Sequence, residues 1–278
     1  LTNRYNVLIG DSAGYNNVDG AANTAIGSRS LYENIDGFYN TATGYGSLAN
    51  NTGDNNTAHG ASSLTNNITG SSNTAQGVGA MASNTTGSYN TAIGMQSLYA
   101  NTTGALNTAV GYQALEDATT ASSNTAVGTQ ALNKNTTGAS NSAFGEATLF
   151  TNTTGGFNTA YGRNALFANT IGGSNTAVGY VAGYSNTTGT ANIAIGPYAL
   201  ENNSTSGYNV VIGNEAGRYT TGEKNTLIGY NAGISNTSGE FNCYIGESSG
   251  GFATTGTRNT FIGTSAGYAM TTGAKNTI

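Results

Sequence analysis

The sequence has little of what most globular proteins use for charge, rigidity and chemistry. Of its 278 residues only 8% are charged, and it has one proline, one cysteine, one histidine and no tryptophan. The single cysteine excludes an intrachain disulfide framework and a cysteine-based zinc site. With 8 basic residues against 13 acidic ones, it has no basic stripe for phosphates. No apolar run reaches the length of about 18 residues that a membrane-spanning helix needs, so we expect neither a nucleic-acid partner nor membrane insertion by this segment.

Catalysis also lacks the residues it would need. His59 is the one histidine, so no Ser/His/Asp set with a second base can be built. The carboxylates are scattered, whereas a carbohydrate-active enzyme on a parallel β-helix would need them clustered. Calcium-binding solenoids place aspartates at repeated loop positions, where this chain has Asn, Thr and Ser. We expect no enzyme activity, no catalytic residue, no cofactor and no bound metal.

What the sequence has in abundance is glycine, with 42 residues, and many of these follow a recurring Asn-Thr-Ala-apolar-Gly string. We call the glycine of this string the main glycine. It recurs every 17 residues, with two intervals of 16, at Gly10, Gly27, Gly44, Gly60, Gly77, Gly94, Gly111, Gly128, Gly145, Gly162, Gly179, Gly196, Gly213, Gly229, Gly246 and Gly263. Because no change in composition interrupts the repeat, we predict one β-solenoid domain over residues 1–278. The chain stops partway through a motif at 276–278, so we expect it to be truncated at both ends.

Within each repeat the pattern favours strands over helices. Apolar residues do not recur at helical spacing, and a second glycine follows ten residues after the main glycine in most copies, as at Gly87, Gly104, Gly138 and Gly155. We therefore predict an all-β parallel β-roll of about 16 coils with two short strands in each coil. Both short copies lose a residue in the same arm, at 48–53 and 217–222, which indicates an outer loop.

Two columns of the repeat exchange volume. The residue two before the main glycine is Ala in eleven copies, and the residue four after it is Leu or Met in ten. Where the later residue becomes glycine, as at Gly250, the earlier one becomes large, as at Tyr244. Ala177 with Gly183 is the one exception. Such exchange is typical of side chains that share one close-packed interior, so we place both columns inside the coil.

The residue directly before the main glycine should point outward, because side chains alternate along a strand. We call this column the outward row. It is apolar or aromatic in thirteen of sixteen copies, a ladder larger than soluble monomers tolerate in water. We expect other copies of the chain to cover it, which predicts a homo-oligomer. The expected interface residues are Ile26, Ile93, Val110, Val127, Val178, Ile195, Ile212, Ile228, Ile245 and Ile262.

Asparagine stands four residues before the main glycine in all sixteen copies, on the side of the interior. A buried amide needs partners, and a stack of identical amides supplies them along the solenoid. We expect an Asn ladder in which the amides have a structural role, although a ligand role is the alternative. Its representative members are Asn23, Asn40, Asn73, Asn90, Asn107, Asn124, Asn158 and Asn175.

The outward row contains three consecutive polar residues, Thr43, His59 and Gln76. On a symmetry axis, copies of His59 would converge. One hypothesis is an axial ion or water site, and the other is a polar layer that fixes register between chains.

Aromatic residues recur five positions after the main glycine, and they could stack on sugars of a receptor or glycan, or cap the leucines at the corners. The candidates for glycan contact are Tyr32, Tyr99, Phe150, Phe167 and Tyr184. Glycosylation sequons also recur, for example at Asn84, Asn101, Asn135 and Asn152. Turn chemistry is sufficient to explain these sequons.

Two strings carry a family resemblance. The string Thr24 to Gly27 followed by Ser30, repeated from Thr91 to Ser97, resembles the head repeats of YadA-like trimeric autotransporter adhesins. The string Asn107 to Leu115 is similar to repeats in bacteriophage fibre proteins and other bacterial surface proteins. The resemblance spans essentially the whole chain, but the coil is longer than in those adhesin heads, and no coiled-coil stalk or membrane anchor accompanies it.

The resemblance implies a left-handed β-roll with three chains about a common axis. It also implies a function as a stiff spacer or adhesive head in a surface fibre or phage tail fibre, located outside the cell or on a virion, with a host surface glycan or receptor as a possible partner. The alternative is a monomeric ice-binding solenoid whose Thr-rich face orders water.

Overall fold

The computed structural model describes residues 5–278 and divides into two compact units, Leu1–Ser140 and Asn141–Ile278. Residues 5–278 contain strands and turns but no helix. This part of the chain therefore contains no helix that could cross a membrane.

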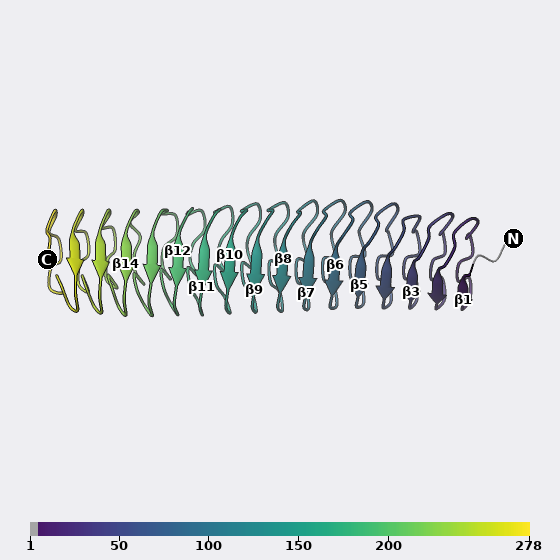
Figure 1. The fold of residues 1–278 in the computed structure, drawn as a ribbon, viewed down its shortest axis with the longest axis horizontal. Coiled ribbons are helices and arrows are strands. Elements are labelled where there is room, and N and C mark those ends of the chain that lie inside the picture. Colours follow the sequence, from purple (N-terminus) through teal and green to yellow (C-terminus); the bar gives the residue numbers. More distant parts are fainter. Residues whose placement is uncertain (1–4) are drawn as a thin grey trace. The chain divides into compact units, whose positions relative to one another are not determined.

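Each unit is a stack of coils, and each coil contributes one three-residue strand (Figure 1). The first unit holds β1 (Val7–Ile9), β2 (Thr24–Ile26), β3 (Thr41–Thr43), β4 (Thr57–His59), β5 (Thr74–Gln76), β6 (Thr91–Ile93), β7 (Thr108–Val110) and β8 (Thr125–Val127). The second holds β9 (Ser142–Phe144), β10 (Thr159–Tyr161), β11 (Thr176–Val178), β12 (Ile193–Ile195), β13 (Val210–Ile212), β14 (Thr226–Ile228), β15 (Cys243–Ile245) and β16 (Thr260–Ile262).

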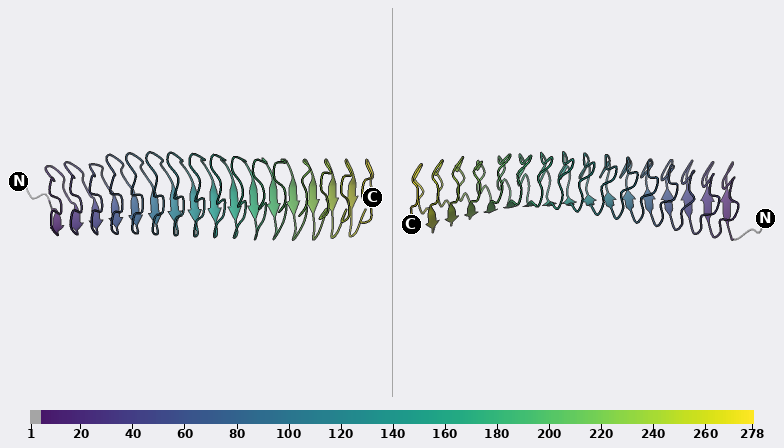
Figure 2. Two further views of the ribbon diagram at one scale, coloured as in Figure 1. Left: turned by 180° about the vertical axis from the view of Figure 1, so that it is seen from behind. Right: turned by 90° about the horizontal axis from the view of Figure 1, so that it is seen from above.

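Within a unit, each strand pairs in parallel with the strand of the next coil, and equivalent residues of the repeat lie opposite each other. Ile93, for example, pairs with Val110, and Val110 pairs with Val127. Figure 2 shows these side-by-side strands from two further directions. The prediction of an all-β parallel β-solenoid with a 17-residue repeat is confirmed.

The prediction of two strands in each coil is wrong, because the arm after the main glycine forms turns. Gln96 and Leu98 stand two and four residues after Gly94, and both have positive φ, 55° and 50°. Left-handed residues curl the chain and cannot continue a strand. Hydrogen bonds between coils continue through these turns: the Leu98 N–H donates to the carbonyl oxygen of Ala114 at 2.9 Å.

The main glycine is required by both conformation and space. Gly94 has φ of +130°, and a Cβ on it would lie 2.4 Å from the carbonyl oxygen of Gly111 in the next coil. No side chain fits at that distance from backbone, so only glycine allows the coils to stack at this corner.

The interior confirms the predicted volume exchange. In the common type of coil, Ala92 and Leu98 are both fully buried. In the exchanged type, Tyr244 is fully buried, and a Cβ on Gly250 would lie 2.6 Å from its Cδ2 atom. The large side chain before the main glycine therefore occupies the space that the leucine after it would fill.

In the exceptional coil with Ala177 and Gly183, a side chain of the preceding coil fills part of the interior. A Cβ on Gly183 would lie 3.0 Å from Cδ2 of Leu166, which belongs to the preceding coil. Side chains can therefore exchange volume between coils as well as within one.

Candidate functional site

The outward row is uncovered in the single chain. Its side chains leave the sheet on the face opposite the buried alanines: Ala25 is fully buried, whereas Ile26 beside it is 42% exposed. All ten expected interface residues, namely Ile26, Ile93, Val110, Val127, Val178, Ile195, Ile212, Ile228, Ile245 and Ile262, are half-buried or exposed. Each unit thus carries a ladder of β-branched apolar side chains with one face open.

The polar interruption of the outward row lies on β3 to β5. Thr43, His59 and Gln76 occupy paired positions of three successive strands. The Thr43 hydroxyl and His59 Nδ1 form a hydrogen bond, and His59 and Gln76 are exposed. The residues 5–278 hold no cluster of three or more His, Cys, Asp or Glu side chains that could bind a metal. An axial ion site would therefore need side chains from other copies, and it stays a prediction.

The asparagines four before the main glycine lie in the interior and connect successive coils. The Oδ1 atom of Asn73 accepts the backbone N–H of Asn90 at 3.0 Å. The Nδ2 atom of Asn73 donates to the carbonyl oxygen of Gly87 at 2.8 Å. The pattern repeats along the row, as at Asn107 and Asn175, whose Oδ1 atoms accept the backbone N–H of the next asparagine and whose Nδ2 atoms donate to a backbone carbonyl oxygen. Both ends of the amide are thus satisfied inside the solenoid, which gives these residues a structural role.

A second asparagine row, seven residues after the main glycine, was not anticipated. Asn84 and Asn101 are fully buried, and Asn101 Nδ2 donates to Asn84 Oδ1 at 2.7 Å and to the Gly104 carbonyl oxygen at 3.0 Å. The signal in the sequence was the recurrence of Asn in this column, which we interpreted as turn chemistry with a sequon.

Burial in the second asparagine row also bears on glycosylation. The sequon asparagines Asn84, Asn101, Asn135 and Asn152 are all fully buried. Their Nδ2 atoms donate to the glycine carbonyl three residues later. The atom that would carry a glycan is therefore inaccessible in the folded chain.

A third feature is the edge formed by the residues two and five after each main glycine, which we call the turn edge. Its aromatic members stack on one another: the ring centroids of Phe150 and Phe167 are 5.3 Å apart, and those of Phe167 and Tyr184 are 5.1 Å apart. Tyr32 stacks on Tyr15 at 5.3 Å, and Tyr99 is 40% exposed. Stacking uses the ring faces, so the ring edges are what the consecutive aromatics present outward. Glycan contact by these residues stays a prediction.

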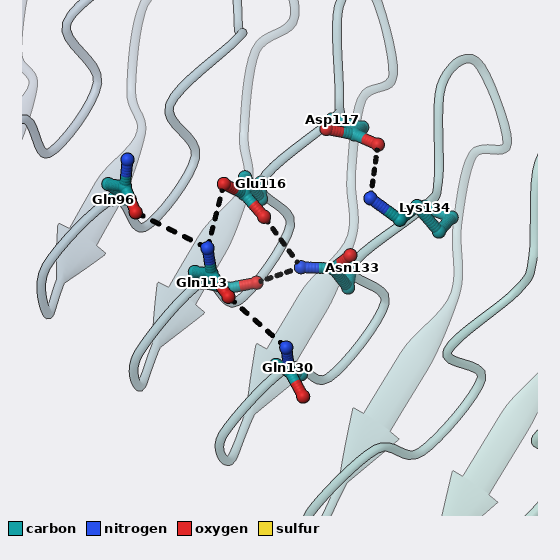
Figure 3. A network of polar contacts seen from close by, with 7 residues as sticks. All are labelled: Gln96, Gln113, Glu116, Asp117, Gln130, Asn133 and Lys134. Carbon is teal, nitrogen blue, oxygen red and sulfur yellow. Dashed lines mark hydrogen bonds and ion pairs between the residues drawn. The ribbon is translucent and has the colours of Figure 1, made fainter.

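Farther along the same edge of the first unit, polar side chains form a network (Figure 3). Gln113 Nε2 lies 3.3 Å from Gln96 Oε1 and 3.0 Å from Glu116 Oε1, and Gln130 Nε2 donates to Gln113 Oε1 at 3.1 Å. Asn133 donates to Glu116 Oε2 at 2.9 Å. These groups satisfy one another, so the network stabilises the edge and leaves little for a ligand.

The turn edge of the second unit carries a cluster of charged side chains around Arg218. Arg218 Nε lies 2.6 Å from Glu201 Oε2, and Arg218 Nη1 lies 3.1 Å from Glu215 Oε2. Its guanidinium also stacks at 4.7 Å from the ring centroid of Tyr198. This cation is therefore held by two carboxylates and an aromatic ring of its own chain.

Comparison with known proteins gives no relative: the sequence matches no family model and no curated protein. The outward row and the turn edge are therefore the features of the chain that bear on its function.

Proposed function

We propose that this chain is a structural segment of a homo-oligomeric fibre, with three copies arranged so that their outward rows cover one another. The observation that carries the proposal is the row itself, a ladder of Ile and Val side chains left half-buried or exposed on both units. Burial of apolar surface of this kind stabilises an assembly by about 25 cal/mol for every Å² removed from water. An identical chain offers a complementary ladder with the same spacing.

The columns beside the outward row suit such packing. Thr stands two positions before the outward residue in most coils and faces the same side, for example Thr108 beside Val110. β-branched side chains suit packing against a pleated sheet surface. In the proposed assembly, Thr43, His59 and Gln76 form a polar layer that penalises a shift of one chain along another, because a shift would place them against Ile or Val.

We infer a mechanical function outside the cell, as a stiff spacer or adhesive head of a surface or virion fibre. Continuous hydrogen bonds between coils, the bonded asparagines four residues before the main glycine and few charged loops resist local unfolding and proteolysis. The resemblance to YadA-like head repeats and phage fibres supports the left-handed, three-chain form of this proposal.

Cross-linking tests the assembly directly. In a Cys243→Ser background, Val127→Cys places a thiol in the outward row, and Thr120→Cys places one on an exposed turn as a matched control. Chains that meet through their outward rows bring the Val127→Cys thiols within disulfide reach, which requires Cα atoms about 4.4–6.8 Å apart. We expect oxidation to give covalent dimers for the first variant only. Equal cross-linking of both variants, or none, contradicts the proposal.

The ice-binding alternative makes a different prediction. A single chain that lowers the freezing point of water below the melting point of ice, while sedimenting as a monomer, would identify the Thr-containing face as the functional surface. Measurement of thermal hysteresis separates the two.

A further inference from the structure

We propose that the turn edge of the first unit binds an acidic saccharide, a sugar that carries a carboxylate, in a hollow between its second and fourth coils. The hollow has a volume of about 210 Å³ and is lined by Arg29, Tyr45, Gly46, Ala49, Asn50, Ser62 and Thr65. All seven residues belong to the first unit, and none belongs to the outward row. The site is therefore independent of whether the chain assembles.

The hollow exists because two side chains of the edge are missing in one coil. The position two after the main glycine changes from Arg29 to Gly46, and the position five after it changes from Tyr32 to Ala49. A Cβ on Gly46 would have no atom within 4 Å, so the space above it is open. At about 30 Å³ for each water, the volume is that of roughly seven waters, which suits a single sugar ring.

Arg29 gives the hollow its charge preference. No carboxylate lines the hollow, and within residues 5–278 no ion pair joins Arg29 to an acidic side chain. Lys134 and Arg163, by contrast, pair with carboxylates of the preceding coil. The Arg29 guanidinium carbon lies 5.1 Å from the ring centroid of Tyr32, which supports it at the rim. A guanidinium held in this way matches the two oxygens of a carboxylate.

The remaining lining suits the neutral parts of a sugar. Tyr45 is 58% exposed and offers an apolar ring face with a polar tip. Asn50 Nδ2 lies 3.3 Å from Asn66 Oδ1, and the Thr65 hydroxyl donates to the Gly46 carbonyl oxygen at 2.9 Å. These bonds orient both groups and still leave the amide and the hydroxyl with further hydrogen-bonding capacity for sugar hydroxyls. A bare phosphate would use Arg29 alone and make no contact with the tyrosine ring.

Titration calorimetry on the full chain tests the site with two probes. The first is a tetrasaccharide of alternating glucuronate and N-acetylglucosamine, and the second is the same tetrasaccharide with its carboxylates reduced to alcohols. We expect the acidic probe to bind at least tenfold more tightly, because only it forms the charge-assisted pair. Arg29→Gln should remove this difference and leave binding of the neutral probe unchanged.

A second variant tests the hollow itself. Ala49→Tyr introduces a residue that the same column already holds at Tyr32 and Tyr99, so the coil should accept it, and the ring would fill the floor. Ala82→Tyr makes the same change in the same column outside the hollow and serves as the control, with folding of both variants checked by circular dichroism. We expect Ala49→Tyr to abolish binding of the acidic probe and Ala82→Tyr to leave it intact.

Three results overturn the proposal: no saturable binding of the acidic probe at millimolar concentration, equal affinity for both probes, or an acidic-probe affinity that Arg29→Gln does not change. If Ala49→Tyr does not fold, the Arg29→Gln comparison still decides. The solution mass of the chain enters none of these results, so failure here is distinct from failure of the proposed assembly.

Discussion

The coil that contains β6 in the first unit and the coil that contains β15 in the second have nearly the same backbone but fill their interiors in opposite ways. In the first, Ala92 is small and Leu98 is large; in the second, Tyr244 is large and Gly250 takes the leucine's place. Leu98 and Gly250 have almost the same φ, 50° and 62°. The turn therefore does not depend on glycine at this position.

The coil therefore requires a fixed interior volume and does not require that one position supply it. The parts that do not vary are the main glycine and the asparagine four residues before it, which together shape the backbone. Side chains in the two inner columns then need only to fill the space between stacked coils.

The largest effect on stability should come from removing the large interior side chain of an exchanged coil. Tyr244→Ala removes the only large side chain of that interior, and Gly250 cannot replace it. Aromatic-to-alanine changes in cores cost about 3–5 kcal/mol, and we expect a loss of about 4 kcal/mol in the free energy of unfolding. Denaturant unfolding followed by circular dichroism at one protein concentration measures it.

The double variant Tyr244→Ala/Gly250→Leu is the control for this loss. It rebuilds the arrangement of Ala92 and Leu98 in the coil of β15, so it should recover at least half of the lost stability. Gly250→Leu alone adds a second large side chain where Tyr244 already fills the space, and should cost about 3 kcal/mol. If both single variants are tolerated, the two columns do not share one interior.

A smaller effect on the free energy of unfolding is expected at alkaline pH, and it comes from Tyr244 in the exchanged coil of β15. Burial raises the pKa of Tyr244 to about 12, whereas an unfolded tyrosine has a pKa near 10. The unfolded chain therefore loses this proton first. The contribution of Tyr244 is complete below about pH 10 and is lost as the pH rises toward 12, with a slope of at most about 1.4 kcal/mol per pH unit.

Tyr244→Phe keeps the ring and removes the titrating group. Its free energy of unfolding should fall less steeply than that of the parent chain between pH 10 and 12, while the other tyrosines titrate alike in both proteins. Parallel slopes for the two proteins would mean that the Tyr244 hydroxyl is not held away from solvent.

The smallest effect is expected at the polar layer of the first unit, which interrupts the outward row that continues without a break in the second. His59→Ile extends the apolar ladder and removes the hydrogen bond with Thr43. Thermal unfolding should show unchanged or slightly raised stability, within about 1 kcal/mol. A large loss of stability would favour an axial ligand site over a layer that sets register. Elemental analysis that finds an ion in the parent protein and none in His59→Ile would favour the same site.

The sequence predicted the features that recur with the period. The 17-residue spacing predicted stacked parallel coils, and the exchange between Tyr244 and Gly250 predicted which columns are buried, since volume conservation is visible in one chain with many copies. The prediction of a second strand in each coil is wrong because residues such as Leu98 adopt positive φ. Non-glycine residues rarely adopt this conformation, so their presence in the sequence does not indicate it. That conformation depends on contacts with the neighbouring coils.

The candidate sites were predicted less completely, for two physical reasons. The asparagines at Asn84 and Asn101 recur visibly, but their burial depends on the turn that follows the main glycine. The hollow around Gly46 and Ala49 is lined by residues of three successive coils. No single column of the repeat therefore reveals it. The outward row was identified from alternation alone, because a strand fixes which side chains leave the sheet.

Sedimentation equilibrium of the intact chain in dilute buffer shows whether sister chains cover the outward row. We expect a mass about three times the 27.9 kDa of one chain, retained down to micromolar concentration. A folded species that sediments as a single chain, with Ile93, Val110 and Val127 open to water, would contradict it.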